Sequence, residues 1–196
     1  MSGGAAPLAG AAPPFLFEAP MTFKRLSSER VYAGRLLKID RDRVELPNGR
    51  STDLEMVRHP GAAAVVPFVS DDDILMVRQF RYATAGFILE VPAGTLNQGE
   101  SPDACAHREV EEEAGYRAGR LEKLGSIYTT PGFTDEVIHL YAARDLTPTG
   151  QNLDHDEVLT VERLPFRRAI EMIREGGIVD AKSICALMLA RDAASR

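Results

Sequence analysis

Cysteine is scarce in this chain, and long apolar stretches are absent. Its 196 residues include only Cys105 and Cys185, too few for the disulfide framework of a small secreted domain. The longest apolar segment, residues 61–69, is far short of the roughly 20 residues that a membrane-spanning helix needs. We therefore expect no membrane partner and a cytoplasmic, reducing location.

Positive charge is also in short supply. The chain has 23 Lys and Arg against 29 Asp and Glu, a net charge of −6, which argues against a nucleic-acid partner. Lys24 is the first basic residue, so the start of the chain does not resemble a secretory signal. Residues 1–22, rich in Ala, Pro and Gly, are predicted to form a disordered tail. If an acidic protein acts on a polyanion, bound metal and a few arginines must supply the positive charge.

What the chain does contain is one dense motif, residues 94–116, which reads GTLNQGESPDACAHREVEEEAGY. Ser101 followed by Pro102 is typical of a helix start, and Gly115 suits the left-handed conformation at a helix end. Helical periodicity then places three carboxylates on one face, apart from the apolar stripe: Glu109, Glu112 and Glu113.

This acidic face has two possible explanations. Glu109 and Glu113 are like charges one turn apart, which costs roughly 0.2–0.5 kcal/mol in an isolated helix. The arrangement becomes favourable if the carboxylates share a hard cation, because such ions prefer oxygen ligands. The alternative is a solvated face of exposed helix positions. Gly94, Glu100 and Arg108 stand in register with the glutamates, which favours a metal site.

The complete spacing, G-x5-E-x7-R-E-U-x-E-E-x-G-U with U a bulky aliphatic residue, resembles the signature of the Nudix hydrolases. Tyr116 departs from it, but a position that packs should not affect the chemistry. The resemblance implies that Mg²⁺, or Mn²⁺, is held against a diphosphate by the three glutamates and the backbone carbonyl of Ala93. Arg108 is expected to orient the glutamates.

The remaining patterns predict an α/β fold. Alternating or apolar segments indicate strands at 31–39, 43–46, 52–57, 62–69, 74–81, 88–91, 121–128, 137–142 and 158–164, and helical spacing indicates closing helices at 166–175 and 182–191. Strands on both sides of a helix suggest an α/β/α sandwich around a mixed sheet, which is also the Nudix fold. Residues 23–57 are expected to form a β-rich dimerisation subdomain and residues 58–196 the hydrolase domain. In similar enzymes such a subdomain pairs two subunits, so a homodimer is expected.

Residues 128–142, YTTPGFTDEVIHLYA, bear on the substrate. Pro131 lies 16 residues beyond Gly115, and the string resembles the ADP-ribose pyrophosphatase subfamily. That resemblance implies hydrolysis of ADP-ribose to AMP and ribose 5-phosphate, with Glu136 binding ribose hydroxyls. Pro-Gly is also a common turn dipeptide, so a purely structural role is the alternative.

Further candidate ligands lie upstream of the motif. Arg81, with Arg78 nearby, is implied to contact the substrate, and a guanidinium fork suits phosphate. An edge-strand charge that limits aggregation would also explain it. Glu55 and Arg58 close the N-terminal region and are expected to reach the substrate of a partner subunit.

The loop 154–157, Asp-His-Asp-Glu, offers a general base. In similar enzymes a glutamate here positions or deprotonates the attacking water; Glu157 matches that position best, and Glu112 is the alternative. A solvated loop is the simpler interpretation. Two other functions remain open: hydrolysis of another nucleoside diphosphate derivative, such as a GDP-sugar or a flavin dinucleotide, and non-catalytic sensing of ADP-ribose. The presence of every signature glutamate favours an enzyme.

Overall fold

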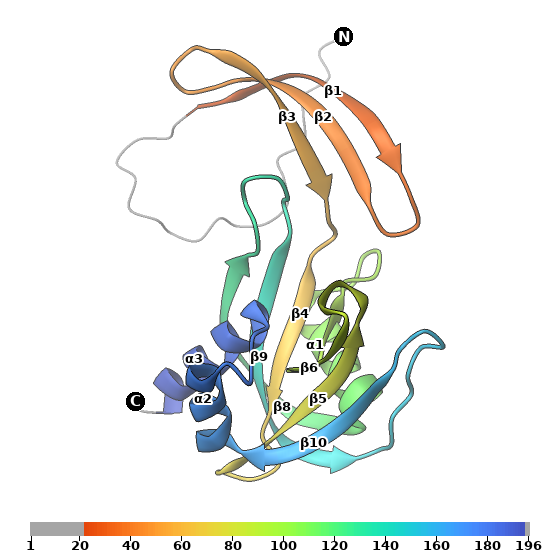
Figure 1. Ribbon diagram of the computed structural model, residues 1–196, viewed down its shortest axis with the longest axis vertical. Coiled ribbons are helices and arrows are strands. Elements are labelled where there is room, and N and C mark those ends of the chain that lie inside the picture. The colour runs from red at the N-terminus through yellow and green to blue at the C-terminus, as the bar shows by residue number, and fades with distance from the viewer. Residues whose placement is uncertain (1–21, 195–196) are drawn as a thin grey trace.

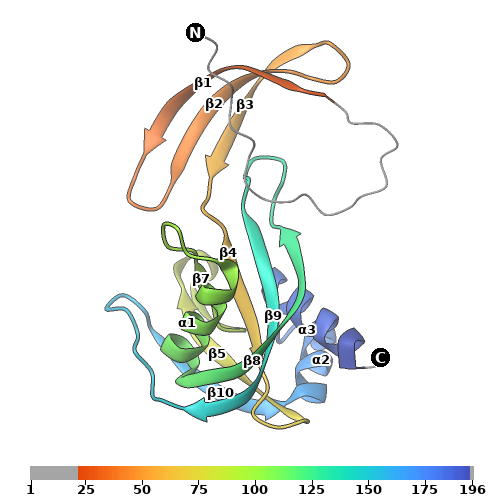
Figure 2. The same ribbon diagram turned by 180° about the vertical axis from the view of Figure 1, so that it is seen from behind.

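The computed structural model describes residues 22–194, so almost all of the predicted tail at 1–22 lies outside the described residues. An antiparallel sheet comes first, in the order β1 (Lys24–Ala33), β2 (Lys38–Glu45) and β3 (Ser51–Arg58). In Figures 1 and 2 this sheet stands apart from the rest of the protein and joins it where β3 leads into β4.

The prediction of one strand over residues 31–39 is wrong. The chain turns between β1 and β2, where the Gly34 N–H donates to the Leu37 carbonyl at 2.9 Å. Apolar residues lie on both sides of this turn, so the apolar pattern continues where the strand does not. Glycine tolerates turn conformations, and it was the only local sign of the break.

The central sheet has the order β7-β4-β9-β8, formed by β4 (Ala62–Pro67), β7 (Ala93–Thr95), β8 (Tyr116–Tyr128) and β9 (Val137–Pro148). It is mixed, because β4 and β9 run parallel while the other pairs are antiparallel. A second antiparallel sheet has the order β10-β5-β6, from β5 (Asp73–Arg81), β6 (Gly86–Glu90) and β10 (Leu159–Pro165), with the short 3₁₀ turn η1 (Tyr82–Thr84) between β5 and β6.

Helices cover both faces of the central sheet, with α1 (Pro102–Ala114) on one side and α3 (Ala181–Ala194) on the other, next to α2 (Phe166–Glu175). Strand β4 shows why its sequence is continuously apolar: successive residues pack alternately against the two helical layers. Ala63 and Val65 belong to the α1 side, and Ala64 and Val66 to the α3 side. The predicted α/β/α sandwich with a mixed sheet is confirmed.

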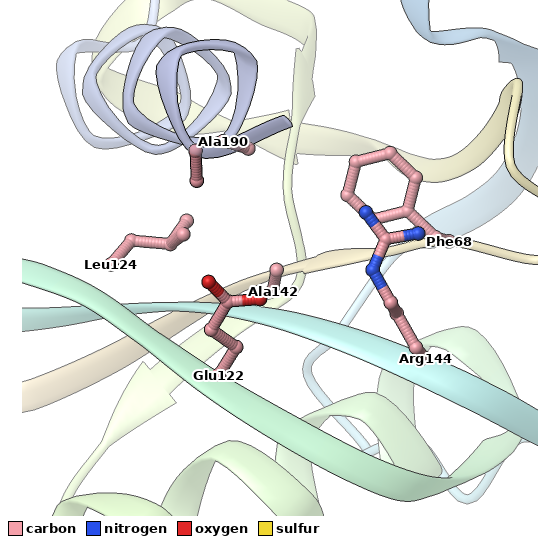
Figure 3. A pocket seen from close by; sticks show the side chains of 7 residues that line it. Phe68, Glu122, Leu124, Ala142, Arg144 and Ala190 are labelled. Atoms are coloured by element: carbon pink, nitrogen blue, oxygen red, sulfur yellow. The ribbon is translucent and has the colours of Figure 1, made fainter. Parts of the chain in front are cut away.

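A small cavity of about 50 Å³ lies where α3 crosses β8 and β9 (Figure 3). The Arg144 guanidinium stacks over the Phe68 ring at 4.2 Å, and Glu122 and Leu124 line the opposite wall together with Ala190. This space has room for only a few water molecules, so a nucleotide must bind elsewhere. Within residues 22–194, no helix combines the length and hydropathy needed to cross a bilayer.

Candidate active site

A second cavity, of about 360 Å³, lies among α1, the strands β5 and β7 and the loop that precedes β10. Its volume falls in the range of small-molecule sites. The cavity brings together most of the residues predicted from the sequence: Arg81, Ala93, Arg108, Glu109, Glu112, Glu113 and Glu157. Six further residues also line it: Gln79, Gly94, Thr95, Asn97, Asn152 and Asp154.

Helix α1 begins and ends as its sequence predicts. The Ala104 N–H donates to the Ser101 hydroxyl at 3.2 Å, and Pro102 opens the first turn. Gly115 ends the helix with φ 76°, a left-handed conformation that strains most residues with a Cβ. The caps therefore fix where the helix begins and where it ends.

Two of the three glutamates are buried. Glu109 is 5% exposed and Glu113 is 2% exposed, whereas the side chain of Glu112 is 35% exposed. The alternative of a solvated face of exposed helix positions is therefore wrong for Glu109 and Glu113. Burial is the main cause that raises the pKa of Glu109 to about 7 and that of Glu113 to about 8, because a charged carboxylate is poorly solvated there.

Arg108 connects the start of the motif to its acidic face. Its Nε and Nη2 donate to the Glu100 carboxylate at 2.9 and 3.0 Å, and this contact lowers the pKa of Glu100 to about 2. Its Nη1 donates to Glu109 at 2.5 Å and to Glu112 at 2.9 Å. These contacts are those expected of a residue that orients the glutamates, a role that stays a prediction.

Gly94 allows the backbone to approach the carboxylates. A Cβ at this position would lie 1.8 Å from Oε1 of Glu109, so any larger residue would displace that carboxylate. One residue earlier, the Ala93 N–H donates to Oε2 of Glu113 at 2.9 Å. The β7 segment therefore binds Glu113 and leaves room for the carboxylate of Glu109.

The donor chemistry of the cavity fits a hard divalent cation. Two buried carboxylates and a third, partly exposed one face a polar cavity, and such oxygens are the ligands that Mg²⁺ prefers. Among residues 22–194, no three acidic, His or Cys side chains already form a metal-binding cluster. Arg108 occupies part of this face, because its Nη1 donates to both Glu109 and Glu112.

The loop that carries Glu157 is docked on the end of α1. The Asn152 N–H donates to the Glu112 carbonyl at 2.9 Å, and Gln151 Nε2 donates to the Glu113 carbonyl at 2.7 Å. The Asp154 N–H then donates to the Glu157 carboxylate at 2.9 Å. Glu157 thereby lines the same cavity as the glutamates of α1.

Strand β5 separates its two predicted arginines. Arg81 lines the cavity and donates to both oxygens of Glu90, at 2.8 Å each. Arg78 pairs with Glu162 of β10 instead and does not line the cavity. Gln79 does line it, two residues before Arg81. The two-residue period of a strand was the signal that could have identified Gln79 from the sequence.

Three other predicted ligands lie outside the cavity. Glu55 is exposed on β3. Arg58 donates to Asp40 of β2 at 3.0 Å and to Asp135 at 3.2 Å. Glu136 accepts a hydrogen bond from the Thr129 hydroxyl at 2.8 Å. Their roles toward a substrate stay predictions.

Comparison with known families decides the class of this site. Residues 57–187 match the NUDIX domain. The chain belongs to the Nudix family. It is a Nudix hydrolase, and Glu109, Glu112 and Glu113 of α1 lie within the matched residues. Residues 23–54 match the nucleoside diphosphate sugar hydrolase N-terminal domain, which corresponds to the sheet β1–β3.

Named relatives of this Nudix hydrolase cover nearly its whole length. It is 42% identical to the methanol dehydrogenase activator of Bacillus methanolicus and 38% identical to the ADP-ribose pyrophosphatase of Bacillus subtilis (strain 168), in each case over 84% of this chain and 90% of the relative. It is also 36% identical to the GDP-mannose pyrophosphatase of Cronobacter sakazakii (strain ATCC BAA-894), over 69% of this chain and 79% of that protein. A crystal structure of an ADP compounds hydrolase matches with a TM-score of 0.80 and 26% identity, over 91% of this chain and 97% of the other.

Proposed function

We propose that this protein hydrolyses the diphosphate of ADP-ribose to AMP and ribose 5-phosphate, with Mg²⁺ or Mn²⁺ as cofactor. The observation that carries this proposal is the shared cavity, which contains the three signature glutamates, Glu157 and Arg81. The similarity to an ADP-ribose pyrophosphatase over 84% of the chain supports the choice of substrate.

Six of the residues around the cavity then have proposed roles. Glu109, Glu112 and Glu113, with the carbonyl of Ala93, would hold the cation. A bound divalent cation supplies charge that neutralises the diphosphate, and it lowers the pKa of a coordinated water. Arg81 would bind a phosphate oxygen, while Arg108 would keep the carboxylates in register.

A panel of substrates tests the proposal. ADP-ribose, GDP-mannose and flavin adenine dinucleotide are each incubated with the protein and Mg²⁺, and the released phosphomonoester is measured. We expect the highest kcat/KM for ADP-ribose. A preference for GDP-mannose would favour the second candidate, hydrolysis of a nucleoside diphosphate sugar, which the match of residues 23–54 supports. Binding of ADP-ribose without turnover would indicate a sensor.

Glu157 is the proposed general base, with Glu112 as the alternative. Glu157 lies in the cavity with its carboxylate held by a backbone N–H, which suits a group that accepts a proton from water. We expect Glu157→Gln to lower kcat and leave KM for ADP-ribose nearly unchanged. A raised KM with unchanged kcat would make Glu157 a substrate ligand instead.

We further propose that the protein is a cytoplasmic homodimer, in which residues 23–57 form the dimerisation subdomain and residues 58–196 the hydrolase domain. Large apolar side chains on β1 and in the turn after it support this assignment, because they are exposed in the single chain: Val31, Tyr32, Leu36 and Leu37. Glu55 and Arg58 would then lie near the partner's substrate. Both cysteines are free thiols, as expected in a reducing compartment.

A further inference from the structure

Glu90 is a buried carboxylate near the cavity and binds two cations. It ends β6 and is 1% exposed. Its two oxygens accept from Nε and Nη2 of Arg81, at 2.8 Å each, and Oε2 also accepts from Nζ of Lys182. A buried carboxylate needs such partners, and one of them, Arg81, also lines the cavity.

Lys182 comes from the first turn of α3, far from the signature in the sequence. Its side chain is 14% exposed, and Nζ also donates to Asp180 at 3.0 Å. Asp180 caps α3, because its carboxylate accepts from the Ser183 N–H at 2.9 Å and from the Ser183 hydroxyl at 2.5 Å. The position of Lys182 is therefore fixed by the same contacts that start the helix.

A second contact joins α3 to the same stretch of chain. The Ser183 hydroxyl accepts from the Val91 N–H at 2.8 Å, and Ser183 is fully buried. Val91 follows Glu90 directly and lies two residues before Ala93, which binds Glu113. The start of α3 thus contacts two neighbouring parts of the site. Lys182 binds Glu90, the partner of Arg81, and Ser183 binds Val91 in the turn that leads to β7.

We propose that Lys182 is a positioning residue for the hydrolytic reaction: it fixes the Glu90 carboxylate, and Glu90 in turn fixes Arg81 so that its remaining N–H groups face the diphosphate. Glu90 occupies the Nε and Nη2 edge of the guanidinium. Within residues 22–194, Nη1 of Arg81 has no hydrogen-bond partner. A guanidinium held along one edge keeps a fixed direction for phosphate at the other.

The charges of this group explain why Lys182 matters. Two cations, Arg81 and Lys182, balance two anions, Glu90 and Asp180. Without Lys182, Glu90 and Asp180 would face each other with Arg81 as their only cation, and a buried charge without its partner is strongly unfavourable. The carboxylate that holds Arg81 would then move, and the arginine would move with it.

Kinetics of Lys182→Met in the full chain test this inference, which rests on the proposed function for its substrate. We expect KM for ADP-ribose to rise about tenfold, because displacement of a substrate-binding group by about 1 Å costs that much or more. The change in kcat should be smaller. Lys182→Arg, which keeps the charge, should restore most of the loss. Lys123→Met, at an exposed lysine of β8, is the matched control and should behave like the unaltered protein.

A double-variant cycle separates positioning from general stability. If Lys182 acts through Arg81, then Lys182→Met should change KM less than about twofold in a chain that already carries Arg81→Met. Equal effects of Lys182→Met in both backgrounds, or an unchanged KM in the folded single variant, would overturn the inference. If Lys182→Met does not fold, Lys182→Gln replaces it and is judged by the same outcomes.

The inference and the proposed function can fail separately. If the unaltered protein does not hydrolyse ADP-ribose, the proposed function fails. The cycle is then run with the substrate from the panel that is hydrolysed, because every candidate contains a diphosphate. If ADP-ribose is hydrolysed and the cycle shows independent effects, only the role of Lys182 is wrong.

Discussion

Single atoms determine how closely the acidic face of α1 approaches the backbone. Gly94 is the clearest case, because a Cβ there would lie within 1.8 Å of the Glu109 carboxylate but meets no backbone atom so closely. The obstacle is the end of a flexible side chain, which can rotate away. The same contact therefore constrains the chemistry of the site more strongly than the stability of the fold.

We expect Gly94→Ala to lower kcat/KM by about 100-fold while the melting temperature changes little, because misplacement of a catalytic group by about 1 Å has effects of that size. Gly125→Ala is the matched control, since Gly125 does not line the cavity and a Cβ there would meet only the Leu189 side chain, at 3.4 Å. Thermal unfolding and steady-state kinetics of both variants check this. A large loss of stability with normal kinetics would contradict it.

The glutamates themselves can be separated from their neighbour Glu111, which pairs with Arg117 outside the cavity. Glu112→Gln and Glu113→Gln should each lower turnover by more than about 100-fold. Mutation of a residue that only hydrogen-bonds a metal ligand already lowers metal affinity or activity by about 10–100-fold, and loss of a ligand itself should cost more. Glu111→Gln should remain active. Rates at saturating Mg²⁺ decide the matter, and near-normal hydrolysis by both cavity variants would refute the assignment.

At the scale of elements, two buried glutamates of α1 make the stability of the metal-free protein depend on pH. The pKa values of Glu109 and Glu113, about 7 and about 8, lie above their ordinary value of 4.5. Between about pH 5 and pH 8 the folded state therefore binds more protons than the unfolded state. The contribution of these two carboxylates to stability therefore falls as pH rises through this range when no metal is bound.

We expect the melting temperature of the EDTA-treated protein to decrease from pH 5 to pH 8. Mg²⁺ should raise it more at pH 8 than at pH 6, because a cation competes with protons for the carboxylates. The double variant Glu109→Gln, Glu113→Gln should lose most of both effects. A flat or rising profile for the metal-free protein would show that these carboxylates stay ionised.

The elements also show where sequence reasoning succeeds. The closing helix predicted at 166–175 is α2, residue for residue, because its apolar period and Gly176 mark it clearly. Strand β7 was missed, because three residues held by backbone pairing with β4 leave no side-chain pattern. For the same reason Asn97 and Asn152, which line the cavity from loops, could not be identified: their positions depend on contacts between distant segments.

At the scale of the whole molecule, the sheet β1–β3 is the part for which we propose a partner. Its apolar side chains are exposed in the single chain, and its main link to the body is near the end of β3, where Arg58 binds Asp135 and the Val57 N–H donates to the Phe133 carbonyl at 2.7 Å. A surface of this kind indicates association.

We expect light scattering to show a dimer at micromolar concentration. Deletion of residues 1–20 should leave the dimer and its activity intact. Deletion through Val57 should give a monomer that binds ADP-ribose weakly, because Glu55 and the sheet are lost together. A monomeric full-length protein with normal activity would rule out a site shared between subunits.

Arg108 has a consequence for how the enzyme matures in the cell. Its contacts with Glu100, Glu109 and Glu112 give the acidic motif an internal counter-ion. We therefore expect the newly made chain to fold before it meets a divalent metal. On this prediction, a cell short of the metal would hold folded but inactive enzyme that becomes active when the ion returns.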